Sequence, residues 1–226
     1  MRIFTIIKSK SERLKHKNFL ALGDKPLWRH LIDELSPCDV TINTDSAQIL
    51  EEVSNLGRSS LRAVPRDQRH IEWEEDPTVL TSPVTDMLID FCADLGEEIV
   101  VLTHVTSPFL KLETLRDAVE ILKTKPSIRS VHSIDQVRDF GWLNRSDEVS
   151  PINFDENVVQ RTQDLDPILV SKGAFFIARA SDIVRTGIRL PPPVHYYALS
   201  KIEAIEIDTG EDFTFASIVN HGLEKS

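Results

Sequence analysis

The sequence has few of the residues that define several common protein classes. Its 226 residues include 2 cysteines and 8 glycines. Two cysteines do not form a disulfide framework, and the GxxxxGK[ST] spacing of a glycine-rich phosphate loop is absent. No apolar run approaches the roughly 18 residues that span a bilayer, and the apolar start, residues 1–7, is too short for a signal-peptide core. We therefore predict a cytoplasmic protein with reduced thiols and no membrane association.

Positive charge is also scarce, but only in part of the chain. Lys and Arg total 26 against 36 Asp and Glu, which gives a formal net charge of -10. This balance argues against nucleic acid or a membrane surface as a partner. Residues 1–29 nevertheless hold eight basic and two acidic side chains, so an anionic small molecule bound near the N-terminus is not excluded. The basic residues are Arg2, Lys8, Lys10, Arg13, Lys15, Lys17, Lys25 and Arg29.

What the sequence does contain is an alternation of strand-like and helix-like segments. Short β-branched or apolar runs predict buried strands, and apolar residues at helical spacing between them predict helices. The expected strands are residues 3–7, 39–44, 61–64, 99–103, 129–134, 174–177 and 204–207. The expected helices are residues 26–35, 45–56, 82–95, 112–123, 180–186 and 212–221.

Two segments depart from this alternation. Residues 65–81 are charged and aperiodic, which predicts a long loop. Residues 135–172 are polar and irregular, which predicts an inserted arm that pairs with another chain or covers a site. The rest of residues 1–226 indicates a single α/β domain, a three-layer sandwich with a mainly parallel sheet. In such sheets, ligands bind beyond the carboxyl ends of the strands.

The loop after the first strand, residues 8–18, is the most informative segment. It is basic and contains Ser9 and Ser11. Hydroxyl and backbone N–H groups can donate hydrogen bonds to a triphosphate while Lys and Arg neutralise its charge. A solvated basic loop would have the same composition, so the residues alone leave both interpretations open.

Two later segments could complete a site at the same edge of the sheet. Strand alternation would place Glu206 and Asp208 on one side, where two carboxylates suit Mg²⁺. The alternative is that Asp208 caps the last helix and Glu206 is solvated. His104 follows the predicted central strand, where it would line a cleft or be an ordinary, partly buried histidine.

Six short segments, in order along the chain, resemble those of the N-acylneuraminate cytidylyltransferase family, which includes the CMP-sialic acid synthetases. In the first loop, Lys8, Ser11, Lys17 and Asn18 fall on the family's Arg, Ser, Lys and Asn. The other five segments are GDKPL at 23–27, NTD at 43–45, HVTSPFL at 104–110, TQDLD with KGA at 162–166 and 172–174, and IEIDTGED at 205–212.

The resemblance implies a Rossmann-like nucleotidyltransferase fold and a homodimer whose swapped arm, at about 135–172, helps close the partner's sugar site. It also implies an enzyme that joins CTP to a sialic-acid-like (ulosonic acid) sugar and releases pyrophosphate. The implied roles are triphosphate binding by Lys8, Ser11, Arg13 and Lys17, base recognition by Asn18, a nucleotide contact by Arg66, Mg²⁺ binding by Glu206 and Asp208, and sugar binding by His104, Gln163 and Phe176. Lys8, Lys17 and Asp208 form the expected catalytic set, and His104 is a candidate general base.

Glu12 is the main departure from the family, which has a triphosphate-binding lysine there. A carboxylate facing a triphosphate is repulsive by several kcal/mol at an effective dielectric of about 20. Either Lys10, Arg13 or Lys15 takes over the phosphate contact and Glu12 points away, or the activity is altered or lost. The alternatives are a nucleotidyltransferase for a different acid or sugar phosphate, a glycosyltransferase that uses a nucleotide sugar, and a non-catalytic nucleotide-binding homologue.

Overall fold

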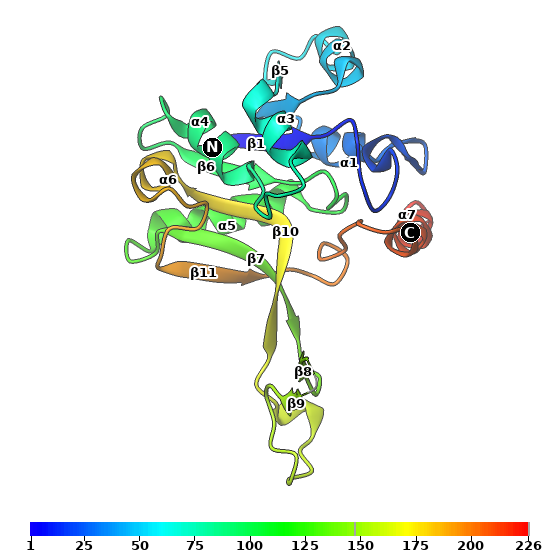
Figure 1. Cartoon of the computed structure of the whole chain (residues 1–226), viewed down its shortest axis with the longest axis vertical. Coiled ribbons are helices and arrows are strands. Elements are labelled where there is room, and N and C mark those ends of the chain that lie inside the picture. Colours follow the sequence, from blue (N-terminus) through cyan, green and yellow to red (C-terminus); the bar gives the residue numbers. More distant parts are fainter. Residues whose placement is uncertain (147, 226) are drawn as a thin grey trace.

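Seven strands form the central sheet of the computed structural model, which describes residues 1–146 and 148–225 (Figure 1). They run in the order β11-β7-β10-β6-β1-β4-β5 across the sheet. β10 is antiparallel to β6 and β7, and the other neighbouring pairs are parallel, so the predicted mainly parallel sheet is confirmed. The strands are β1 (Arg2–Ile7), β4 (Asp39–Thr44), β5 (Leu61–Pro65), β6 (Ile99–Thr103), β7 (Ser130–Val137), β10 (Ile168–Arg179) and β11 (Val194–Ala198).

The central strand β1 is buried on both faces. Ile3 and Ile7 belong to one core cluster, and Phe4 and Ile6 belong to another, because successive side chains of a strand point to opposite faces. Helices cover both clusters, which makes the fold the predicted three-layer sandwich. The first face is covered by α1 (Leu27–Glu34), α2 (Ala47–Asn55) and α5 (Leu112–Thr124), and the second by α4 (Val84–Cys92) and α6 (Ala180–Thr186).

Helix α7 (Gly210–Leu223) begins at a capping box. The hydroxyl oxygen of Thr209 accepts a hydrogen bond from the Asp212 backbone N–H at 3.2 Å, and the Asp212 carboxylate accepts one from the Thr209 N–H at 2.8 Å. Thr209 is therefore the N-cap, and the alternative in which Asp208 caps this helix is wrong. α7 packs on a small hairpin made of β2 (Ala21–Leu22) and β3 (Lys25–Pro26).

Residues 65–81, predicted as a loop, contain helix α3 (Gln68–Glu75). Asp67 caps it, with its carboxylate accepting a hydrogen bond from the Arg69 N–H at 3.0 Å. His70 is the buried residue of this helix. The prediction was wrong because charged side chains rather than an apolar stripe hold α3 in place, and apolar spacing is the main sequence sign of a helix.

The predicted strand at residues 204–207 is also wrong. Residues 205–208 are irregular and are held by a hydrogen bond from the Ile207 N–H to the Thr106 carbonyl oxygen at 2.8 Å. The last strand is instead β11, which pairs in parallel with β7 at the sheet edge. The short VHYYA segment of β11 is only half-buried, so it lacks the continuous apolar run that marked the central strands.

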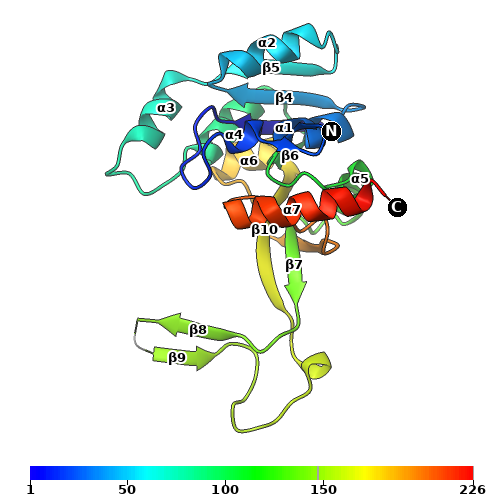
Figure 2. The same ribbon diagram turned by 90° about the vertical axis from the view of Figure 1, so that its right-hand side faces the viewer.

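A long arm projects from one end of the sheet (Figures 1 and 2). The outer parts of β7 and β10 form its stem, paired from Ile134 with Ser171 to Val137 with Ile168. β8 (Trp142–Arg145) and β9 (Glu148–Pro151) form an antiparallel hairpin farther out. Five apolar side chains of the arm are exposed: Trp142, Val149, Ile152, Val158 and Val159.

Both cysteines are free thiols. Cys92, the last residue of α4, faces the core, where burial raises the pKa of its thiol to about 12, so it is inert at neutral pH. In the part of the chain that the structure describes, we find no helix with the length and apolar character needed to cross a bilayer.

The core makes one stability prediction. Phe175 in β10 is fully buried and meets Tyr197 edge to face, whereas Phe215 on α7 is 55% exposed. We expect Phe175→Ala to lower the free energy of unfolding by about 3–5 kcal/mol and the control Phe215→Ala to lower it by about 0.5 kcal/mol or less. Urea unfolding followed by circular dichroism measures both, and equal losses would contradict the core assignment.

Candidate active site

A cleft of about 890 Å³ lies beyond the carboxyl ends of the parallel strands. Residues that follow β1, β4, β5 and β6 line it, namely Lys8, Asp45, Arg66 and His104. The cleft brings together ten of the residues predicted from the sequence: Lys8, Ser11, Arg13, Lys17, Asn18, Arg66, His104, Phe176, Glu206 and Asp208.

Gln163 does not line this cleft. It lies in a short 3₁₀ turn, Thr162–Asp164, where its side chain is exposed. The turn belongs to the arm, so within one chain Gln163 is separated from the other predicted sugar-binding residues. Its role in sugar binding stays a prediction.

The basic first loop is tied down at both ends. The buried Asn18 side chain donates a hydrogen bond to the Lys8 carbonyl oxygen at 3.0 Å. The Ser9 N–H and hydroxyl donate to the two oxygens of the Asp45 carboxylate at 2.7 and 2.8 Å. These contacts shape residues 8–18 across the cleft. Recognition of a base by Asn18 stays a prediction.

Asp208 joins the loop to the C-terminal part of the chain. Its carboxylate accepts from Lys17 Nζ at 2.8 Å and pairs with the Arg13 guanidinium at 2.9 Å. The Lys17 side chain is only 13% exposed, so this pair is less screened than a surface ion pair. Asp208 thus places two of the predicted phosphate-binding cations at the cleft.

Glu74 of α3 holds two further cations. Its carboxylate pairs with Lys8 at 2.7 Å and with Arg66 at 2.9 Å, and the Arg66 side chain is 2% exposed. Arg66 also donates to the His70 carbonyl oxygen at 3.3 Å. Glu74 was not predicted as a site residue, because its helix was predicted as a loop.

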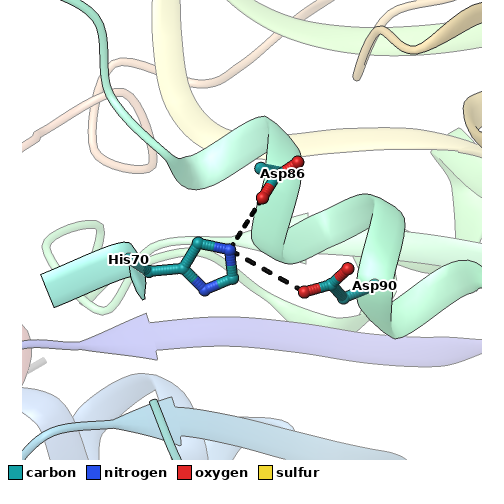
Figure 3. A group of neighbouring side chains, drawn as sticks. All are labelled: His70, Asp86 and Asp90. Carbon is teal, nitrogen blue, oxygen red and sulfur yellow. Dashed lines mark hydrogen bonds and ion pairs between the residues drawn. The ribbon is translucent and has the colours of Figure 1, made fainter. Parts of the chain in front are cut away.

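Helix α3 is fastened to α4 by a group of charged side chains (Figure 3). His70 Nε2 lies 2.9 Å from an oxygen of Asp86 and 3.7 Å from one of Asp90. Three donors this close could hold a metal ion, but Arg69 pairs with both carboxylates. The group therefore serves to fix α3, and with α3 the position of Glu74.

Glu206 is set by the backbone of β10. The Gly173 N–H donates to its carboxylate at 3.3 Å, and a Cβ at position 173 would come within 2.4 Å of the same carboxylate. Glycine at 173 therefore lets Glu206 approach the strand. Glu206 and Asp208 both line the cleft, and two carboxylates fit Mg²⁺ when phosphate oxygens and water supply its other ligands.

His104 is neutral at pH 7. Burial lowers the pKa of its imidazole to about 4, with further lowering from the charges of Arg189, Lys8 and Lys17. A group with this pKa is a weak general base at neutral pH. The position of His104 is therefore better suited to hydrogen bonding and packing than to the general-base role suggested for it.

The part of the cleft next to β10 is aromatic. The Phe176 ring stacks on His132 with centroids 4.4 Å apart and meets His104 edge to face at 6.2 Å. The Arg189 guanidinium lies 4.2 Å from the centre of the Phe176 ring. Arg189, which lines the cleft, and His132, which is buried against Phe176 without lining it, were not predicted from the sequence, because they lie outside the motifs and come from segments distant in sequence.

Glu12 lies at the rim of the cleft. It lines the cleft, yet its side chain is exposed to solvent. Among the described residues it forms no ion pair with Lys or Arg. A solvated carboxylate at a rim repels a bound phosphate less than a buried one, because water and salt screen its charge.

The parallel sheet, the basic loop after its first strand and the facing carboxylates define a nucleotidyltransferase of the α/β type. Residues 6–179 match the family model described as "Cytidylyltransferase". This chain belongs to that family, and the resemblance seen in the sequence is confirmed.

Two relatives share most of this chain. It is 32% identical over 232 residues to the CMP-N,N'-diacetyllegionaminic acid synthase of Legionella pneumophila, with 94% of each chain covered. It is 27% identical over 224 residues to an N-acylneuraminate cytidylyltransferase of Streptococcus agalactiae, covering 91% of this chain and 50% of that protein. The chain thus spans nearly all of the first relative and about half the length of the second.

Solved structures show the same fold at low sequence identity. A CMP:2-keto-3-deoxy-manno-octonic acid synthetase complexed with CTP matches with a TM-score of 0.69 and 13% identity, covering 98% of each chain. A 4-diphosphocytidyl-2C-methyl-D-erythritol synthase from Anaerococcus prevotii matches with a TM-score of 0.66 and 13% identity, covering 97% of this chain and 96% of that one. These matches confirm the predicted Rossmann-like nucleotidyltransferase fold.

The pKa of His104 makes a prediction about acid stability. Folded His104 takes up a proton only near pH 4, whereas the unfolded imidazole does so near pH 6.5. Between these values the unfolded chain binds more protons, so stability falls as the pH falls. We expect this loss to be smaller in His104→Gln by about 2 kcal/mol.

Urea unfolding at pH 7, 5.5 and 4 measures this difference. His221→Gln, which removes an exposed histidine on α7, is the matched control and should follow the wild type. If His104→Gln and the wild type lose equal stability on acidification, the neutral state of His104 is contradicted.

Proposed function

We propose that this protein is a CTP-dependent cytidylyltransferase that activates a sialic-acid-like ulosonic acid sugar, giving a CMP-sugar and pyrophosphate. The observation that carries the proposal is the cleft itself, where Lys8, Arg13 and Lys17 face Glu206 and Asp208 in a cytidylyltransferase fold. The names of the relatives, a diacetyllegionaminic acid synthase and an N-acylneuraminate cytidylyltransferase, support an acidic sugar as the second substrate.

The proposed reaction depends on position and charge rather than on a covalent intermediate. The oxygen of the sugar's anomeric hydroxyl attacks the α-phosphorus of CTP in line, its proton passes to water, and the bond from phosphorus to the pyrophosphate leaving group breaks. Lys8, Ser11, Arg13 and Lys17 would hold the triphosphate, and Arg66 would contact the nucleotide. Bound phosphates would compete with the carboxylates of Glu74 and Asp208 for these cations. The negative charge of the ligand would then replace that of the two carboxylates as the partner of the cations.

We propose Mg²⁺ as the cofactor, held by Glu206 and Asp208. Their carboxylate oxygens are the donor type that this hard cation prefers. The ion would neutralise charge on the phosphates and polarise the α-phosphate. Lys17 and Arg13 hold the Asp208 carboxylate at the cleft, and phosphates that take over these two cations would free it to bind the ion.

We also propose a homodimer formed through the arm. His104 and Phe176 would contact the sugar within one chain. Gln163 lies on the arm, so it would reach a sugar only in the cleft of a partner chain. The exposed apolar side chains of the arm support this pairing, because soluble proteins rarely leave such patches uncovered.

A pyrophosphate-release assay tests the function. The four nucleoside triphosphates are each combined with ulosonic acids or sugar phosphates, with Mg²⁺ or with EDTA. We expect release only with CTP, an ulosonic acid and Mg²⁺. Release with a sugar phosphate or another triphosphate would support a different substrate class. Nucleotide binding in calorimetry without release of pyrophosphate would favour a non-catalytic homologue. The carboxylate of Glu12 in the phosphate-binding loop would then account for the lost activity.

The basic loop makes a kinetic prediction. Lys17→Met removes a nearly buried cation from the proposed triphosphate site and should raise the KM for CTP about tenfold or more, as loss of a charged hydrogen bond does. Lys15→Met, an exposed position of the same loop that does not line the cleft, is the control and should stay within about twofold. Equal KM values for CTP in the two variants would contradict the assignment of Lys17 to the triphosphate.

The arm makes a prediction about assembly. The double variant Trp142→Asp/Val159→Asp places charges on two exposed apolar positions of the arm and should convert a dimer to a monomer in light scattering coupled to size exclusion. Phe215→Asp, which charges an exposed apolar position on α7, should leave the dimer intact. A monomeric wild-type protein, or dissociation only by Phe215→Asp, would rule out this interface.

A further inference from the structure

The basic side chains that line the cleft differ in whether they have an acidic partner. Five of them form ion pairs: Lys8 and Arg66 with Glu74, Lys10 with Glu75, and Arg13 and Lys17 with Asp208. The sixth is Arg189, which lines the cleft. Within residues 1–146 and 148–225, no carboxylate pairs with it.

Arg189 is nevertheless held in a defined place. It follows α6, and its guanidinium lies 4.2 Å from the centre of the Phe176 ring. Phe176 is itself fixed, because it is buried in β10 and stacks on His132, whose Nε2 lies 2.6 Å from the Ser171 hydroxyl. A guanidinium on an aromatic face keeps its plane and its N–H donors available to a ligand.

The environment of Arg189 favours an anion. Partial removal from water lowers the pKa of its guanidinium, and its charge lowers the pKa values of His104 and His132. The side chain of Arg189 is exposed at the cleft, so a ligand can reach its guanidinium. An anionic ligand in the cleft would supply the missing counter-charge.

The position of Arg189 separates this anion from the triphosphate. The cations proposed for the triphosphate come from residues 8–17, the loop after β1, whereas Arg189 lies with Phe176 beside β10. Phe176 is a proposed sugar contact. An anion at Arg189 would therefore lie beside the proposed sugar contact Phe176, where the carboxylate of an acidic second substrate would supply it.

We propose that Arg189 binds the carboxylate of the acidic sugar and makes the enzyme select acids over neutral sugars. The inference rests on the proposed function, since it assumes an ulosonic acid as substrate. The guanidinium offers two parallel N–H donors that match the two carboxylate oxygens, a geometry that lysine cannot reproduce.

The test compares each acid with its neutral ester. N,N'-diacetyllegionaminic acid and N-acetylneuraminic acid are used as free acids and as carboxyl methyl esters, with wild type, Arg189→Met and Arg189→Lys. We expect Arg189→Met to lower kcat/KM for the free acid about 10- to 100-fold, with little change for the ester and with the KM for CTP within about twofold. The kcat/KM of Arg189→Lys for the free acid should lie between those of wild type and Arg189→Met, because lysine keeps the charge and loses the paired donors.

Arg185→Met is the matched control. Arg185 lies on α6, pairs with Asp182 and does not line the cleft, so it should behave as wild type. Equal losses for acid and ester in Arg189→Met would show a merely structural role and overturn the proposal. If Arg189→Met raises the KM for CTP and leaves kcat/KM for the acid unchanged, Arg189 contacts the phosphates instead. That result would also overturn the proposal.

Calorimetry separates this proposal from the proposed function. If the wild type releases no pyrophosphate with any ulosonic acid, the proposed function fails. Binding of the two free acids and their esters, measured with CTP present, then decides the role of Arg189. A preference for acid over ester that disappears in Arg189→Met supports it, and a wild type that binds neither acid more tightly than its ester overturns it.

Discussion

The need to balance the charge of a basic loop governs the architecture of the cleft. Residues 8–17 bring several cations to the end of the sheet, and they can be held close together only if carboxylates face them. Asp208 and Glu74 meet this need, each with two cations. Two of these cations, Lys17 and Arg66, are nearly buried, so they need an anionic partner at all times, and a phosphate, which carries more negative charge than a carboxylate, is able to take that place. The contacts that shape the cleft are thus the ones that bound phosphates would exchange with.

Much of the surrounding structure serves to hold these two carboxylates. The capping box at Thr209 starts α7 directly after Asp208, so the helix fixes the end of the segment that carries this side chain. The contacts of His70 and Arg69 with α4 fix α3, and α3 carries Glu74. The arm stands apart from this arrangement: its stem is continuous with β7 and β10, and it exposes apolar side chains.

The sequence predicts the parts of this protein that depend on apolar pattern and on local motifs. The buried strands β1, β4 and β6 and the helices between them were found by periodicity, and ten site residues by motif. Helix α3 was missed because ion pairs replace its apolar face. β11 was missed because an edge strand is only half-buried. Glu74, His132 and Arg189 could not be found, because their roles arise from contacts between segments far apart in the sequence.

The structure explains why basic residues are concentrated near the N-terminus of an acidic chain. The net charge of -10 disfavours anions in general, yet the cleft concentrates cations whose partners are two carboxylates that a phosphate can displace. Arg189 differs from the others because no described carboxylate compensates it, so a ligand there gains an ion pair without displacing one. Binding at Arg189 would therefore discriminate acids more sharply than binding at Lys8 or Lys17 discriminates phosphates. In the proposed reaction the loop would supply affinity for the nucleotide, and the guanidinium of Arg189 would supply selectivity for the second substrate.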